Sequence, residues 1–184
     1  MYKEIEIADG TKVTLRTMRL GDLDRLLSFI NELVKEKRAD SDSLLYAGFD
    51  IRVTRSEEAE WLAETVKGIR LGKIISVLAE IDGKIIANSE VTRGRYDDTH
   101  RHGQVGLTMI RGYRGKGIGR KVIATLVRES RRAGLRSLEV EFLASSKIAR
   151  RAYEKEGFRQ TGVIPRKIFR NGKYFDGLIM TRKL

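Results

Sequence analysis

The hydrophobic side chains of this 184-residue chain recur at two spacings, and the spacing predicts where helices and strands lie. Two segments in the first half have apolar residues every three or four positions, which is the period of a helix with one buried face. Asp22 is placed to cap the first, which would bury Leu23, Leu26, Leu27, Ile30, Leu33 and Val34. Thr54 starts the second with Glu57 as a capping box, ahead of a stripe of Ala59, Leu62, Ala63 and Val66.

Two further helices are predicted in the second half of the chain. One carries its apolar stripe from Ile118 to Val127 and ends at Gly134, a residue that favours the left-handed cap. A shorter one starts at Ser145 or Ser146, places Tyr153 on its apolar face and ends at Gly157.

Alternating or continuous apolar runs predict the strands. They lie around Val13 and Leu15, at 74–81, at 84–92, from Gln104 to Ile110, from Leu138 to Phe142, and on both sides of Asn171-Gly172. The Asp82-Gly83 and Asn171-Gly172 pairs are typical of hairpin turns. The order predicts a mixed α/β (α+β) fold with a central, mostly antiparallel sheet of about seven strands flanked by four helices.

Composition supports one globular domain over residues 1–184, because 41% of the residues are hydrophobic and 34% are charged. The sequence has no cysteine, which excludes disulfides and thiolate metal sites. No apolar run approaches the roughly 20 residues that span a bilayer, and the alternating charges after Met1 argue against a signal peptide. We therefore expect a soluble, cytoplasmic protein that does not contact membranes.

Basic residues are concentrated in the last part of the chain. Residues 1–110 contain 17 basic and 19 acidic residues, whereas residues 111–184 contain 20 basic and 6 acidic ones. These basic residues either form a solvated surface without a partner or bind a polyphosphate. The polyphosphate could be nucleic acid or a phosphorylated cofactor. Charge alone does not choose between them.

A glycine-rich segment between a strand and a helix favours the phosphorylated cofactor. Gly112, Gly115, Gly117 and Gly119 alternate with Arg111, Arg114, Lys116 and Arg120 directly before the predicted helix. Free N–H groups at a helix start bind anions, and glycines let a phosphate approach the backbone. The segment lacks the Gly-Lys-Ser/Thr ending of a P-loop, and its glycine spacing differs from that of dinucleotide-binding folds.

Two blocks of sequence resemble the GNAT superfamily of acyl-CoA-dependent N-acyltransferases. Residues 114–119, Arg-Gly-Lys-Gly-Ile-Gly, match its R/Q-x-x-G-x-G/A signature, and residues 149–158 resemble its A-x-x-L-Y-E-K-x-G-F segment. The resemblance covers nearly the whole chain and implies a GNAT fold. It also implies an N-acetyltransferase that uses acetyl-CoA as co-substrate and acts on a small amine or a protein N-terminus, and homodimers are common among such relatives.

The resemblance implies a role for each matching residue. Main-chain groups of Met109 and Ile110 would hold the pantetheine arm and polarise the thioester. The amides of Arg114, Gly115, Lys116, Gly117, Ile118, Gly119 and Arg120 would bind the pyrophosphate. Tyr153 would return a proton to the leaving thiolate, which suits a phenol that stays protonated at neutral pH. Ser146 stands where the family usually has an asparagine beside pantetheine.

The general base is the open question. Close relatives have a glutamate where this chain has Gln104, and an amide does not accept a proton. The remaining side-chain candidates are His102, Glu90, His100, Glu139 and Glu141, and a water path to bulk solvent is the alternative. Two histidines two residues apart do not make a zinc site without further ligands, so no metal is expected.

The acceptor is expected to contact the irregular stretch from Ala39 to Arg52, together with the strand around Glu90 and the final hairpin. The negative charges of the irregular stretch are Asp40, Asp42 and Asp50, and its aromatic side chains Tyr46 and Phe49 could surround an amine. Two other functions remain open, namely an acyl-CoA sensor without turnover and a basic nucleic-acid-binding module. Aromatic residues make up only 7% of the chain, which disfavours a stacking surface for nucleic acid.

Overall fold

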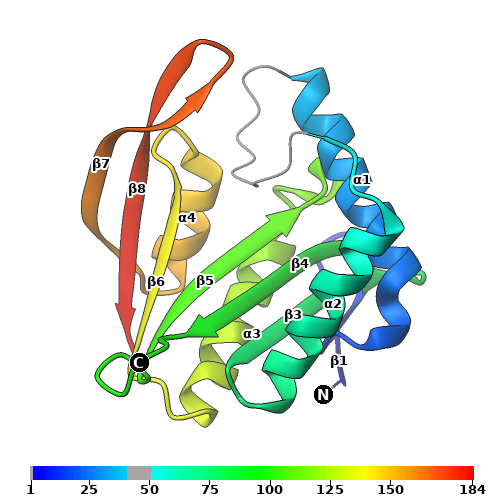
Figure 1. Ribbon diagram of the computed structural model, residues 1–184, viewed down its shortest axis with the longest axis horizontal. Helices are drawn as coiled ribbons and strands as arrows, with labels where there is room; N and C mark the ends of the chain where they lie inside the picture. Colours follow the sequence, from blue (N-terminus) through cyan, green and yellow to red (C-terminus); the bar gives the residue numbers. More distant parts are fainter. Residues whose placement is uncertain (1, 41–50) are drawn as a thin grey trace.

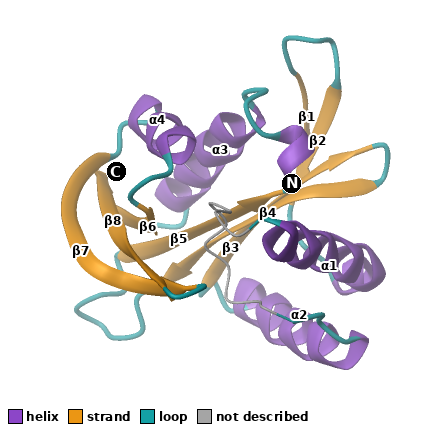
Figure 2. Ribbon diagram, turned by 90° about the horizontal axis from the view of Figure 1, so that it is seen from above, coloured by secondary structure: helices purple, strands orange, loops and turns teal. Residues whose placement is uncertain are grey.

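The computed structural model describes residues 2–40 and 51–184 and contains one twisted sheet with helices on both faces (Figures 1 and 2). The strands of this part of the chain are β1 (Tyr2–Glu6), β2 (Lys12–Arg16), β3 (Ile74–Ile81), β4 (Lys84–Arg93), β5 (His102–Met109), β6 (Ser137–Leu143), β7 (Arg159–Arg170) and β8 (Lys173–Lys183). The α-helices are α1 (Leu23–Ala39), α2 (Arg55–Arg70), α3 (Ile118–Arg132) and α4 (Lys147–Lys155).

The sheet has the strand order β1-β2-β3-β4-β5-β6-β8-β7, and every neighbouring pair is antiparallel except β5 and β6. The predicted mixed α/β architecture with four helices is therefore confirmed, with eight strands in place of about seven. The strand that sequence reasoning missed is β1 at the sheet edge. It is short and mostly exposed, with Ile5 half-buried, so it lacks the apolar run of an inner strand.

The four helices form a layer on each face of the sheet. Helices α1 and α2 cover one face, and α3 and α4 cover the other (Figure 2). Each layer has its own core, one built on Val122, Ile123 and Leu126 of α3 and the other on Leu33 and Leu62 of α1 and α2. Within the described ranges, no helix is both long and apolar enough to cross a membrane.

Local sequence signals explain several turns and helix ends. Asp82 and Gly83 have φ of 48° and 78°, and the corresponding values at Asn171 and Gly172 are 49° and 74°, as a tight hairpin turn requires. The capping box at Thr54 is present, with its side chain accepting from the Glu57 N–H.

Asp22 precedes α1, but its side chain does not cap the helix, contrary to the prediction. Its carboxylate is buried and accepts two hydrogen bonds from the Arg16 guanidinium, at 2.7 and 2.8 Å. Arg16 is itself buried and needs a counter-charge, so the ion pair takes the carboxylate away from the helix end.

Strands β5 and β6 separate along their length, and this opening positions the site. They pair from His102 with Ser137 to Val105 with Val140, after which no further pair forms between them, although β5 continues to Met109 and β6 to Leu143. Figure 1 shows the two strands meeting at one end and diverging toward the other. Beyond Val105, the side of β5 that faces β6 is therefore open to other groups.

Candidate active site

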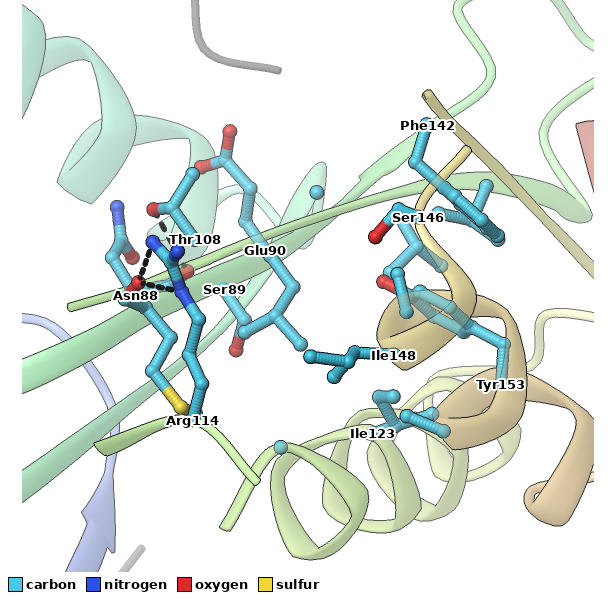
Figure 3. A pocket seen from close by; sticks show the side chains of 18 of the residues that line it. Asn88, Ser89, Glu90, Thr108, Arg114, Ile123, Phe142, Ser146, Ile148 and Tyr153 are labelled. Atoms are coloured by element: carbon cyan, nitrogen blue, oxygen red, sulfur yellow. Dashed lines mark hydrogen bonds between the residues drawn. The ribbon is translucent and has the colours of Figure 1, made fainter. Parts of the chain in front are cut away.

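A pocket of about 650 Å³ lies where β5 and β6 diverge. Its lining comes from β4, β5, the glycine turn before α3, the helix α4, and the inner faces of α1 and α2. Figure 3 shows side chains of β4 and β5 on one side of the pocket and those of α4 on the other. Lining residues that the sequence predicted as functional are Glu90, Met109, Arg114, Gly115, Gly117, Gly119, Arg120, Glu141, Ser146 and Tyr153.

The end of β5 directs one main-chain N–H toward the gap. The Ile110 N–H donates to the Ile86 carbonyl on β4, at 3.1 Å. Alternate residues of an antiparallel strand bond to the same neighbour, so the N–H of Met109 faces the opposite side, toward β6. Both main-chain groups of Ile110 are already used, because its carbonyl accepts from the Tyr113 N–H.

The glycine turn adopts a backbone conformation that favours glycine and leaves open space beside it. Gly115 and Gly117 have φ of +79° and +83°, and Gly117 is the N-cap of α3. A Cβ added at either position would meet no other atom within 4 Å. The first N–H groups of the 15-residue helix have no partner within the helix. The turn is thus shaped to admit an anionic group close to the backbone.

The cations of the turn are already paired with carboxylates. Arg111 bonds to Asp40, Lys116 lies 3.8 Å from Asp9, and Arg120 lies 2.7 Å from Glu156. By contrast, Arg151 and Lys155 of α4 line the pocket and have no acidic partner in the described part of the chain. Sequence reasoning did not single out these two residues, although they are one helical turn apart.

Tyr153 is held by aromatic packing on α4. Its ring stacks on Phe142 with centroids 5.5 Å apart and meets the edge of Phe158 at 5.1 Å. The side chain is only 4% exposed, and burial raises the pKa of its phenol, which keeps the hydroxyl protonated. Tyr153 and Ser146 both line the pocket, and Figure 3 shows them on the same side of it. Ser146 is the N-cap residue of α4, but its side chain makes no capping hydrogen bond.

Two carboxylates without partners line the same pocket. Glu90 of β4 has a buried Oε2 with no hydrogen-bond partner, and burial raises the pKa of this carboxyl. Glu58 of α2 is 5% exposed, its side chain forms no hydrogen bond or ion pair among the described residues, and burial raises the pKa of its carboxyl to about 7. Sequence reasoning missed Glu58. The available signal was a carboxylate at the start of the buried stripe 58, 62, 65 and 66 of α2.

The structure does not bring every predicted residue to the pocket. His102 lies at the opposite end of β5 from Met109, with Nδ1 2.9 Å from the Ser137 hydroxyl, and does not line the pocket. Ile110, Lys116 and Ile118 are also absent from its lining, and Ile118 packs in the core beneath the turn.

The other base candidates differ in position. Glu141 lines the pocket but bonds to Lys167, at 2.6 Å. Glu139 and His100 are not among the lining residues, and neither is Gln104, which is exposed where β5 pairs with β6.

The predicted acceptor-binding stretch is only partly described. Residues 41–50 lie outside the described residues, so the predictions for Asp42, Tyr46, Phe49 and Asp50 are not addressed. Asp40 bonds to Arg111, directly before the glycine turn. No group of three or more potential metal ligands occurs among residues 2–40 and 51–184.

Comparison with known proteins places this site in a family. Residues 42–158 match the model of the Acetyltransferase (GNAT) family. The chain is 25% identical over 176 residues to the Bacillus subtilis protein YwnH, which is named after phosphinothricin acetyltransferases, covering 94% of this chain and 99% of YwnH. The chain therefore belongs to the GNAT family of acetyltransferases, as the two sequence blocks indicated.

Solved structures support the same fold. A ribosomal-protein-alanine N-acetyltransferase from Brucella melitensis has a TM-score of 0.77 and 22% identity, covering 92% of this chain and 99% of that one. YncA from Salmonella typhimurium, solved with its cofactor acetyl-CoA, has a TM-score of 0.77 and 20% identity, covering 94% of both chains.

Proposed function

We propose that this acetyltransferase transfers an acetyl group from acetyl-CoA directly to a primary amine, either of a small molecule or of a protein N-terminus. The observation that carries the proposal is one gap in which three features meet. They are the Met109 N–H at the end of β5, the glycine turn at the start of α3, and the Tyr153 side chain from α4. YncA, which has the same fold, binds acetyl-CoA.

The residues present fit acetyl-CoA, which supplies the acetyl group as a reactive thioester. Open space beside Gly115 and Gly117 and the N–H groups of the first turn of α3 suit a pyrophosphate. Arg151 and Lys155 add unpaired positive charge for its phosphates. The Met109 N–H donates to the thioester carbonyl oxygen and stabilises the negative charge that develops there. Ser146 lies along the same wall and contacts the pantetheine arm.

Tyr153 supplies the proton for the leaving group. A neutral amine attacks the acetyl carbon, the new C–N bond forms, and the C–S bond breaks. The thiolate takes the phenol proton, and the phenolate recovers a proton from the nitrogen of the new amide. Burial keeps the phenol protonated before this step, so the proton is present when the thiolate needs it.

The amine requires a base, and a carboxylate of the pocket is the best-placed group. Gln104 has no basic atom, and His102 lies away from the pocket. Glu90 lines the pocket, and Figure 3 shows it on the side opposite Ser146 and Tyr153. The acceptor therefore enters from the β4 side, between the sheet and the α1–α2 layer, while acetyl-CoA lies against α3 and α4.

Ligand-dependent melting tests the proposal together with turnover. Acetyl-CoA at 100 times its Kd should stabilise the protein by about 2.7 kcal/mol, and an oligonucleotide of equal charge should not. CoA release should then depend on an added primary amine. Stabilisation by the oligonucleotide alone would favour a nucleic-acid-binding module, and acetyl-CoA binding without turnover on any amine would favour a sensor.

A further inference from the structure

Glu58 and Glu90 reach one pocket from two separate elements, helix α2 and strand β4. Neither carboxylate forms an ion pair or a side-chain hydrogen bond with the described residues, and Oε2 of Glu90 is buried without a hydrogen-bond partner. Other acidic side chains of the pocket region differ in this respect. Glu36 pairs with Arg114 at 2.7 Å, Glu141 bonds to Lys167, and Glu156 pairs with Arg120.

An unpaired buried carboxylate destabilises a protein, because ionisation in a dry environment loses the hydration energy of the charge. Glu58 is 95% removed from solvent and carries this cost without compensation. A bound cation would supply the missing partner. The pocket's own cations do not pair with Glu58. Arg114 pairs with Glu36, and Arg120 pairs with Glu156. No ion pair joins Arg151 or Lys155 to Glu58 among the described residues.

We infer that Glu58 and Glu90 together bind the acceptor's amino group as its ammonium form, and that this pair selects amines without a carboxylate next to the reacting nitrogen. The inference rests on the proposed function and deepens it by naming the acceptor-binding residues and the class of acceptor. A free amino acid would bring its own carboxylate into a pocket that already holds two unpaired carboxylates, and like charges that share a low-dielectric site repel.

The rest of the acceptor is expected to be apolar near the amine. Leu26, Phe29 and Ile30 of α1 and Trp61 of α2 line the same pocket as Glu58. Trp61 lies three residues after Glu58 and therefore on the same face of α2. An arylalkyl amine and the N-terminus of a peptide both offer an ammonium group on a stem without a nearby carboxylate.

Glu58 also accepts the ammonium proton. The step converts R–NH₃⁺ and the Glu58 carboxylate into R–NH₂ and the Glu58 carboxylic acid, and the neutral amine then attacks the thioester. Glu90 holds the amino group while Glu58 takes its proton. Glu58 replaces the base that the family carries at the Gln104 position, and its raised pKa suits proton transfer near neutral pH. The other charged residues that line the pocket are Glu90, Glu141, Arg114, Arg120, Arg151 and Lys155. The nearby elements β2, β3 and the turn before α1 carry the paired charges Arg16, Glu80 and Asp22.

Selectivity between matched amines tests the inference. Phenethylamine and phenylalanine differ only in the carboxylate, and a short alanine-initiated peptide represents a protein N-terminus. We expect kcat/KM for phenethylamine or the peptide to exceed that for phenylalanine at least tenfold. In the Glu58→Gln/Glu90→Gln double variant the ratio should fall to within about threefold. The control is Glu60→Gln, which removes an exposed carboxylate of α2 outside the pocket and should leave the ratio unchanged. Preference for the peptide over phenethylamine would identify a protein acceptor.

The pH profile separates proton transfer from binding. In the unmodified enzyme, kcat/KM should rise with pH to a plateau above about 7, as the Glu58 carboxyl ionises. In Glu58→Gln this limb should be lost, and the rate should instead rise with the fraction of unprotonated amine. Glu90→Gln should raise the KM of the amine and keep the limb. Equal kcat/KM values for phenethylamine and phenylalanine, or an unchanged pH profile of kcat/KM in Glu58→Gln, would overturn the inference. If acetyl-CoA still raised the melting temperature in that case, the proposed function would stand.

Discussion

Arg114 donates two hydrogen bonds to the main-chain carbonyl of Met109, from Nε at 2.8 Å and from Nη2 at 2.5 Å. The contact ties the glycine turn to the last residue of β5, five positions earlier in the chain. The signature arginine thus acts on the protein's own backbone and orders the strand end whose N–H faces the gap. Its Nη1 also pairs with Glu36 of α1, at 2.7 Å.

Replacement of Arg114 should weaken acetyl-CoA binding because the strand end and the turn lose their common anchor. We expect Arg114→Met to raise the KM for acetyl-CoA about tenfold, a usual consequence of small misplacement at a site. Stability should also fall, because Glu36 is only 11% exposed and would keep only the more distant Arg111, at 3.5 Å, as a cationic partner. Adding Glu36→Gln should recover most of the melting temperature without recovering the KM. Recovery of both would mean that Arg114 acts through stability alone.

Gly117 offers a test of the phosphate site with a matched control. Gly117→Ala and Gly134→Ala place a Cβ in the same left-handed conformation at the two ends of α3, where φ is +83° and +81°. Each should cost about 1–2 kcal/mol of stability. Only Gly117 lines the pocket, so only Gly117→Ala should raise the KM for acetyl-CoA, by tenfold or more. Equal effects on KM would remove the assignment of the turn to the pyrophosphate.

Tyr153→Phe should lower kcat without changing the fold. Phenylalanine keeps the packing against Phe142 and Phe158 and removes only the hydroxyl. We expect a loss of about 10²-fold in kcat, at the low end for a proton-transfer group, with acetyl-CoA affinity within twofold of the unmodified enzyme. A variant with full activity would show that Tyr153 has only a packing role.

Much of the fold was predictable because its signals are local. The Asp82-Gly83 and Asn171-Gly172 turns and the Thr54 capping box each depend on neighbours in the sequence, and the structure contains all of them. The helix stripes hold in part, because most of their leucine, isoleucine and valine positions are buried, whereas Ala63 is exposed and the buried Phe29 was not assigned to the first stripe. Asp22 is a case in which the local signal gave a wrong prediction. Its sequence position suggests a cap, but Arg16, on a strand, draws its carboxylate into an ion pair.

The site was predictable where a sequence block carries it and not where distant elements meet. The sequence blocks point to the turn from Arg114 to Arg120 and to Tyr153, and these residues lie beside the pocket except for Lys116 and Ile118. Glu58 was missed because its burial could not be predicted from its neighbours in the sequence. The pocket that it lines also takes residues from β4 and α1, which are distant in the sequence. His102 was an attractive base by its usual pKa, yet its place at the far end of β5 keeps it from the pocket.

The buried Glu58 carboxyl predicts how stability changes with pH. Burial raises its pKa from 4.5 to about 7 in the folded protein, so the folded state binds this proton more tightly than the unfolded one. Stability is therefore lost as pH rises from about 4.5 to 7, as the folded protein must ionise a buried group. Glu58→Gln should raise the melting temperature at pH 8 by roughly 3 °C or more, and by much less at pH 5.

The exposed Glu60 gives the control for this measurement. Glu60→Gln changes the same charge on the same helix, so it should have a small effect that is equal at the two pH values. A pH-independent gain in Glu58→Gln, or a gain shared by Glu60→Gln, would contradict the proposed cost of the buried carboxylate.

Acetyl transfer itself can be measured directly by incubating the purified protein with acetyl-CoA and phenethylamine or an alanine-initiated peptide, and quantifying both products by mass spectrometry. The account predicts that acetylated amine and free CoA form in equal amounts, that neither forms without protein, and that Tyr153→Phe slows both equally. Free CoA without acetylated amine, or no turnover on any primary amine despite acetyl-CoA-dependent stabilisation, would contradict direct transfer to an amine.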